Sequence, residues 1–77
     1  MPRKGNSEII WRVFVGGFRM ELWQSRSSIP FAYNYTLLFG IVAQPEAICI
    51  THLGDDAEEA ANMFARKVEA HRRMMQA

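Results

Sequence analysis

The stretch EIIWRVFVGGFRMELWQS, residues 8–25, constrains the fold more than any other part of the chain. Residues 8–15 are rich in β-branched and aromatic side chains, which predicts a strand. After Gly16-Gly17 apolar and polar side chains alternate, which predicts a second strand. A Gly-Gly pair tolerates the positive φ angles of a tight two-residue turn, so we expect a β-hairpin. The alternative is one long strand interrupted by a glycine bulge.

Alternation assigns the side chains of this hairpin to two faces. In the first strand one face would carry Ile9, Trp11, Val13 and Val15, and the other Ile10, Arg12 and Phe14. In the second strand one face would carry Phe18, Met20 and Leu22, and the other Arg19, Glu21 and Trp23. The pattern therefore predicts an apolar face and a mixed polar and aromatic face.

Two further strands are expected after the hairpin. The sequence YNYTLLFGIVA is apolar from Leu37 to Val42, which is typical of a central strand covered on both faces. We expect a turn at Gln44-Pro45-Glu46, because proline lacks a backbone N–H, and then a fourth strand at AICITHL. The four strands would form an antiparallel meander.

From Asp55 to about Met75 the apolar spacing changes from two residues to 3.6, which predicts an amphipathic helix. The side chains expected to face the sheet are Ala57, Ala61, Phe64, Val68, His71 and Met75. We expect Asp55 to be the N-cap, with Glu58 three residues later in a capping-box arrangement. The predicted fold class is thus α+β, with a four-stranded antiparallel meander and one C-terminal helix packed on one sheet face.

Length and composition predict a flexible tail over residues 1–7 and a single domain over residues 8–77. Hydrophobic residues make up 49% of the chain. This is more apolar surface than a single thin core can bury, so we expect a protein partner and a homodimer. The lone Cys49 allows no intramolecular disulfide, and the N-terminal residues lack the pattern of a signal peptide. The longest apolar run, Leu37 to Ala43, is far shorter than the roughly 20 residues that span a bilayer. We expect a cytoplasmic protein that does not contact membranes.

Catalytic and metal chemistry finds little support in the sequence. The stretch THLGDDAEEA offers Asp55, Asp56 and Glu59 for a hard cation, with His52 for a softer metal. It lacks a second histidine at helical spacing and a loop of alternating oxygen ligands, and helix capping explains its acids. Cys49 has no recognisable base beside it and is expected to pack as a small hydrophobe. We expect no enzyme, cofactor or metal.

The remaining function is binding, and the mixed sheet face is the predicted binding surface. Its candidate residues are Arg12, Phe14, Arg19 and Trp23, joined by Tyr33 and Tyr35, which fit either surface. Tyr and Arg are enriched in protein interfaces. We expect a small non-enzymatic protein-binding module, an inhibitor or adaptor of the kind that phages and mobile elements encode.

A single-stranded nucleic-acid-binding module is the alternative, because Arg and aromatic side chains hold phosphates and stack bases. The order of elements resembles that of small single-strand-binding folds of the transcriptional-coactivator and Pur type, although none of their sequence motifs occurs here. The order of elements alone does not transfer function. The formal net charge is only +1, and Glu21 and Glu46 would repel phosphates, so we favour a protein partner.

Overall fold

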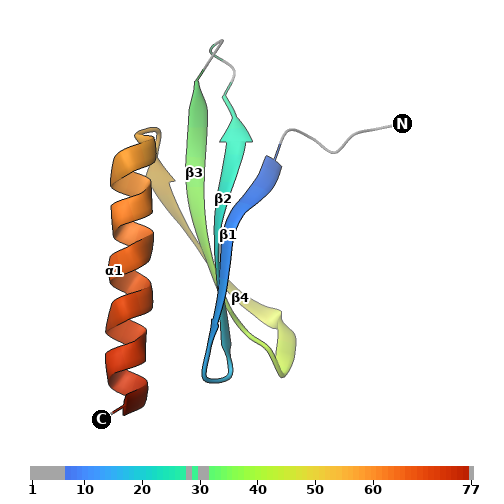
Figure 1. Ribbon diagram of the computed structural model, residues 1–77. Coiled ribbons are helices and arrows are strands. Elements are labelled where there is room, and N and C mark those ends of the chain that lie inside the picture. Colours follow the sequence, from blue (N-terminus) through green and yellow to red (C-terminus); the bar gives the residue numbers. More distant parts are fainter. Residues whose placement is uncertain (1–6, 28, 30–31, 77) are drawn as a thin grey trace.

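The computed structural model describes residues 7–27, 29 and 32–76. Its strands are β1 (Ser7–Val15), β2 (Phe18–Arg26), β3 (Tyr33–Ile41) and β4 (Gln44–Gly54), and its helix α1 spans Ala57–Gln76. The strands form one antiparallel sheet in the order β1-β2-β3-β4, with α1 along one side of it (Figure 1). The predicted four-stranded meander with a C-terminal helix is confirmed. The predicted tail lies outside the described residues except for Ser7, which is the first residue of β1.

Gly16 and Gly17 form a two-residue hairpin turn and not a bulge. Val15 pairs with Phe18 directly across the turn. Gly16 has a φ of 64°. Gly17 does not have a positive φ, and a positive φ at the first turn residue alone defines a type II′ turn, whose twist suits the flanking strands. From this turn the ladder continues to Arg12, which lies opposite Glu21.

The first strand departs from strict alternation at Ile10. Ile9 pairs with Trp23, while Trp11 pairs with Leu22, so one extra residue of β1 lies between the two pairs. Such a β-bulge exchanges the faces on its two sides. Ile9 therefore shares a face with Trp23 and not with Trp11, contrary to the prediction.

The turn between β3 and β4 comes earlier than predicted. It lies at Val42-Ala43, and the residues expected to turn, 44–46, belong to β4. Ile41 pairs with Gln44, and the next pair is Gly40 with Ile48, so residues 45–47 make an irregular, unpaired stretch. Proline is tolerated there because β4 is an edge strand. The central position predicted for β3 is correct, since it lies between β2 and β4.

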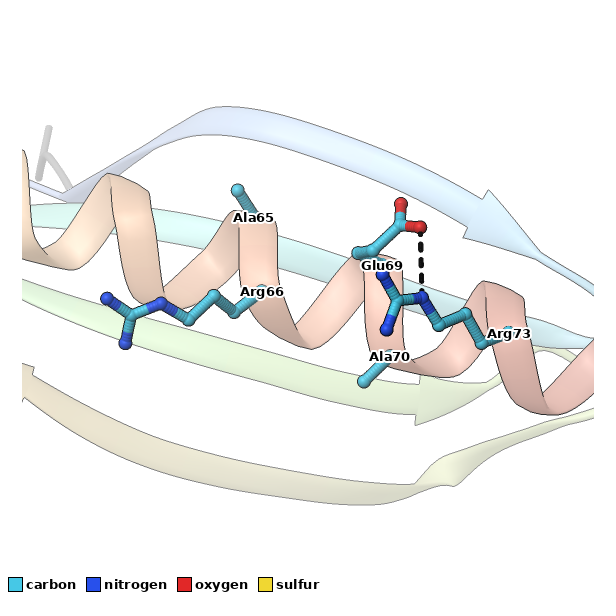
Figure 2. Close-up of a pocket in the computed structure, with 5 residues that line it drawn as sticks. All are labelled: Ala65, Arg66, Glu69, Ala70 and Arg73. Carbon is cyan, nitrogen blue, oxygen red and sulfur yellow. Dashed lines mark ion pairs between the residues drawn. The ribbon is translucent and has the colours of Figure 1, made fainter.

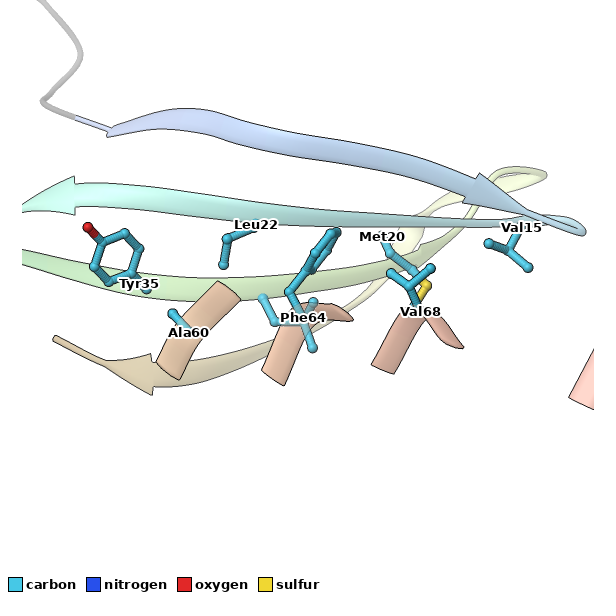
Figure 3. Close-up of a cluster of buried hydrophobic side chains, with 8 residues drawn as sticks. Val15, Met20, Leu22, Tyr35, Ala60, Phe64 and Val68 are labelled. Carbon is cyan, nitrogen blue, oxygen red and sulfur yellow. The ribbon is translucent and has the colours of Figure 1, made fainter. Parts of the chain in front are cut away.

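The core lies between α1 and the facing side of the sheet (Figure 3). Its buried hydrophobic residues are Val15, Met20, Leu22, Tyr35, Leu37, Ala60, Phe64 and Val68. The helix adds a buried His71 to this face. Ala57 and Met75, predicted at the two ends of the apolar stripe, are exposed. The buried helix residues therefore run from Ala60 to His71, and beyond them the exposed Met75 still lies against the turn at Gly16.

The helix begins one residue later than predicted, with Asp56 and not Asp55 as its N-cap. The Glu59 backbone N–H donates to Asp56 Oδ1 at 3.0 Å, and the Ala60 N–H donates to the Asp56 carbonyl at 2.9 Å. Asp55 is exposed and follows Gly54, whose φ of 96° turns the chain out of β4. Glu59 consequently occupies the N3 position that the sequence assigned to Glu58.

Candidate binding surface on the open sheet face

The sheet face opposite α1 forms a surface that we call the open face. Three cross-strand rows build it: Phe14, Arg19, Gly40 and Ile48; Arg12, Glu21, Leu38 and Ile50; and Ile9, Trp23, Thr36 and His52. Residues directly opposite in an antiparallel sheet share a face, so every row continues from β1 to β4. Four of the six predicted binding residues, Arg12, Phe14, Arg19 and Trp23, lie together on this surface.

Glu21 occupies the middle of the open face and is only 2% exposed. Its Oε2 accepts a hydrogen bond from Arg12 Nε at 2.8 Å, and its Oε1 accepts one from Trp23 Nε1 at 2.8 Å. Arg19 Nε lies 3.3 Å from the same Oε2 but is not aligned to donate to it. Its attraction to the carboxylate is therefore mainly electrostatic. A buried carboxylate is stable only when charge and hydrogen bonds compensate its lost hydration, and these three side chains do so.

The cluster of Glu21, Arg12, Arg19 and Trp23 holds two guanidinium groups in defined places. Arg19 extends over Gly40, where an added Cβ would lie 3.5 Å from Arg19 Nη2. The side chains of Arg12 and Arg19 remain 48% and 31% exposed. Two cations against one anion leave an excess positive charge, and the guanidinium nitrogens that face solvent can donate to acceptors on another molecule.

Apolar side chains surround this cluster on the open face. Phe14 is 60% exposed, Ile48 45% and Ile50 58%. A hollow beside them is lined by Ser7, Trp23, Ser25, Thr36, Leu38 and Ile50. Exposed apolar side chains that adjoin fixed polar groups are a feature of many interaction sites.

Tyr33 and Tyr35 lie on the other side of the sheet. Tyr35 pairs with Gln24, is 6% exposed within the core, and donates from its hydroxyl to Gln24 Oε1 at 3.1 Å. Tyr33 packs against the edge of the core, with the guanidinium of Arg26 6.0 Å from its ring centre. Neither tyrosine contributes to the open face: Tyr35 belongs to the core, and Tyr33 lies half-buried at its edge.

The structure gives each residue considered for metal binding or catalysis a place in the fold. Among the residues that the structure describes, no three His, Cys, Asp or Glu side chains gather as metal ligands. Cys49 is exposed, contrary to the expectation that it packs as a small hydrophobe. His71 is buried edge-on against the rings of Phe18 and Phe39, at 4.6 and 5.4 Å between ring centres. Its environment is that of a core residue.

A second hollow lies on the solvent side of α1, lined by Ala65, Arg66, Glu69, Ala70 and Arg73 (Figure 2). Arg73 Nε lies 3.4 Å from Glu69 Oε2, an ion pair between residues four apart that is weak on an exposed helix surface. Two small alanines between long charged side chains produce this depression. It is ordinary helix surface, and we assign no ligand to it.

No family model matches the chain, and neither the curated proteins nor the solved structures that were compared with it provide a match. Within the described part of the chain, no helix is long and apolar enough to cross a membrane. A functional conclusion must therefore come from the surface itself.

The central role of Glu21 was missed by reasoning from the sequence, which treated it as an unpaired repulsive charge. A two-residue turn at Gly16-Gly17 pairs residues whose numbers add up to 33, and this rule alone places Glu21 opposite Arg12. Arg19 and Trp23 are its neighbours two positions away on the same face. The cluster was therefore present in the sequence once the turn was assumed.

Proposed function

We propose that this chain is a small non-enzymatic protein-binding module whose partner docks on the open face. The observation that carries the proposal is the cluster around Glu21, which holds Arg12, Arg19 and Trp23 beside exposed apolar side chains. Trp and Arg are the residue types that most often dominate binding energy. Holding them in place before binding reduces the entropy lost when a partner docks.

The surface also defines the chemistry of the partner. Exposed Phe14, Ile48 and Ile50 require apolar side chains opposite them, and the excess positive charge of the arginines favours a carboxylate or backbone carbonyl between these contacts. The lone exposed thiol of Cys49 suits a reducing compartment such as the cytoplasm. A small domain with one organised binding face fits an inhibitor or adaptor, and proteins of this class are often encoded by phages or mobile elements.

Affinity capture from the native host, read by mass spectrometry, identifies the partner, and titration with the purified partner then tests the surface. We expect Trp23→Ala to weaken binding by about 2 kcal/mol or more, roughly thirtyfold, as loss of a hot-spot residue does. The matched control is Arg66→Ala, an exposed residue on the helix surface, which should leave the affinity unchanged. If Trp23→Ala and Phe14→Glu both bind as tightly as the wild type, the open face is not the docking surface.

Single-stranded nucleic acid is a second candidate ligand, because Arg12, Arg19, Phe14 and Trp23 combine guanidinium and aromatic groups on one sheet face. Binding through phosphates would weaken log-linearly as salt rises. Trp23 lies on the open face and Trp11 on the helix side, with its ring 5.9 Å from Phe64, so a Trp11→Phe variant isolates the fluorescence of Trp23. We expect no binding tighter than about 10 µM near physiological salt. A submicromolar, salt-sensitive complex that quenches Trp23 would favour this second function.

A further inference from the structure

The outer edge of β4 is open along the sheet. β4 pairs with β3 on one side and has no described strand on the other. Only Ala47 and Leu53 of its eleven residues are half-buried, and the others are exposed. The outward main-chain N–H and C=O groups of such an edge can be satisfied only by water or by another strand.

The two edges of the sheet differ in how they are protected. β1 has the bulge at Ile10 and carries the charged Glu8 and Arg12, features that hinder pairing with another strand. β4 is irregular at residues 45–47 and again at Leu53, but between these points Ile48–His52 pairs regularly with β3. This regular stretch contains no Lys, Arg, Asp or Glu. The β1 edge thus has features that hinder pairing with another strand, whereas the stretch Ile48–His52 of β4 has none.

We propose that Ile48–His52 pairs antiparallel with the same stretch of a second copy, centred on Ile50, so that two sheets of four strands become one continuous sheet of eight. In this register Ile50 meets Ile50 of the second copy, Cys49 meets Thr51, and Ile48 meets His52. Because no residue in the stretch carries a fixed charge, self-pairing brings no like charges together. The regular stretch has two residues on each side of Ile50, so all five of its residues find a partner in this register.

Symmetry determines the arrangement of the rest of the dimer. The two-fold axis of an antiparallel strand pair is perpendicular to the sheet, so paired residues share a face. Both helices therefore lie on one side, and both open faces join into one surface on the other. A stretch of five paired residues is only about 16 Å long, and an interface of this size belongs to the weak class. We expect a dissociation constant in the micromolar range, with Ile48 and Ile50 partly covered.

Two charge variants test the pairing by sedimentation equilibrium from about 5 to 300 µM. Cys49→Lys with Thr51→Lys would place like charges opposite one another twice, and we expect the dissociation constant to rise by about tenfold or more. Cys49→Lys with Thr51→Glu is the matched control, because it places opposite charges in the same positions and should retain the dimer. Both residues point to the helix side of the sheet. Partner binding on the open face therefore remains intact, and a failure of this proposal is distinguishable from a failure of the proposed function.

Disulfide trapping tests the register. Directly opposite residues have Cα atoms about 4.5–5.5 Å apart, within the range of a disulfide. Thr51→Cys in the chain that keeps Cys49 should therefore form a covalent dimer with oxidised glutathione. The same substitution combined with Cys49→Ser should not, because its only thiols lie diagonally across the axis.

Three results would overturn the proposal: a wild-type monomer at about 300 µM, a dimer to which both charge variants are indifferent, or no covalent dimer in the variant with two thiols. A dimer that Phe14→Glu breaks while both charge variants leave it intact would place the contact on the open face instead.

Discussion

Replacing Glu21 by Gln tests whether the buried carboxylate organises the open face. The substitution keeps the shape of the side chain and an oxygen that accepts the hydrogen bond from Trp23, but removes the charge that attracts the two arginines. A hydrogen bond to a charged group contributes about 1.5–3 kcal/mol net. The Arg12 side chain is 48% exposed and that of Arg19 is 31% exposed, so both regain hydration when released, which reduces the cost.

These contributions predict that Glu21→Gln lowers the free energy of unfolding by about 1–2 kcal/mol. Urea denaturation monitored by circular dichroism measures this value, and thermal melting should show a decrease of roughly 4–8 °C per kcal/mol for a domain of this size. The matched control is Glu69→Gln, which removes an exposed carboxylate paired with Arg73 and should change stability by less than about 0.5 kcal/mol. If Glu21→Gln costs no more than this control, or stabilises the fold, the carboxylate does not hold the arginines as argued.

Three further predictions concern the fold. Asp56→Ala should cost about 1 kcal/mol as the loss of an N-cap, whereas Asp55→Ala should be nearly neutral in urea titration, and a chelator should leave the melting temperature unchanged. Phe64→Ala, at a side chain only 3% exposed, should cost about 3–5 kcal/mol, and a loss below about 1.5 kcal/mol would contradict its place in the core. Gly16→Ala should destabilise by about 1 kcal/mol or more because of the positive φ, whereas Gly17→Ala, whose φ is not positive, should cost less; equal effects in thermal melting would refute the assigned turn.

Most of the architecture was predictable because the spacing of apolar residues is unambiguous in the hairpin, where it is two residues, and in the helix, where it is 3.6. The alternation from Phe18 to Trp23 and the central position of β3 follow directly from side-chain spacing and composition. The same is true of the helix face, although its buried residues begin at Ala60 and not at Ala57. Spacing identifies the face of an element but not how far a neighbouring layer extends along it, so the ends of the stripe were misplaced.

The sequence interpretation was wrong at three places, and at each of them two local arrangements fit the residues almost equally well. The sequence places Pro45 in a turn, but an edge strand accommodates proline equally well. Only the pairing of β3 with β4 distinguishes the two positions. The N-cap fell on Asp55 because Asp55 and Asp56 are chemically identical candidates separated by one residue. The β-bulge at Ile10 has no glycine or proline beside it, so the sequence contains no signal that predicts it. Each outcome depends on tertiary contacts that a single sequence does not display.

The order in which the elements appear along the chain has a consequence for synthesis. Every strand pairs with its neighbour in sequence, so the meander can form from short-range contacts, which favours rapid folding. The helix that covers Met20, Leu22 and Leu37 is the last element to be made. Without α1 the sheet leaves these apolar side chains exposed to solvent, so a chain truncated before Ala57 is expected to aggregate.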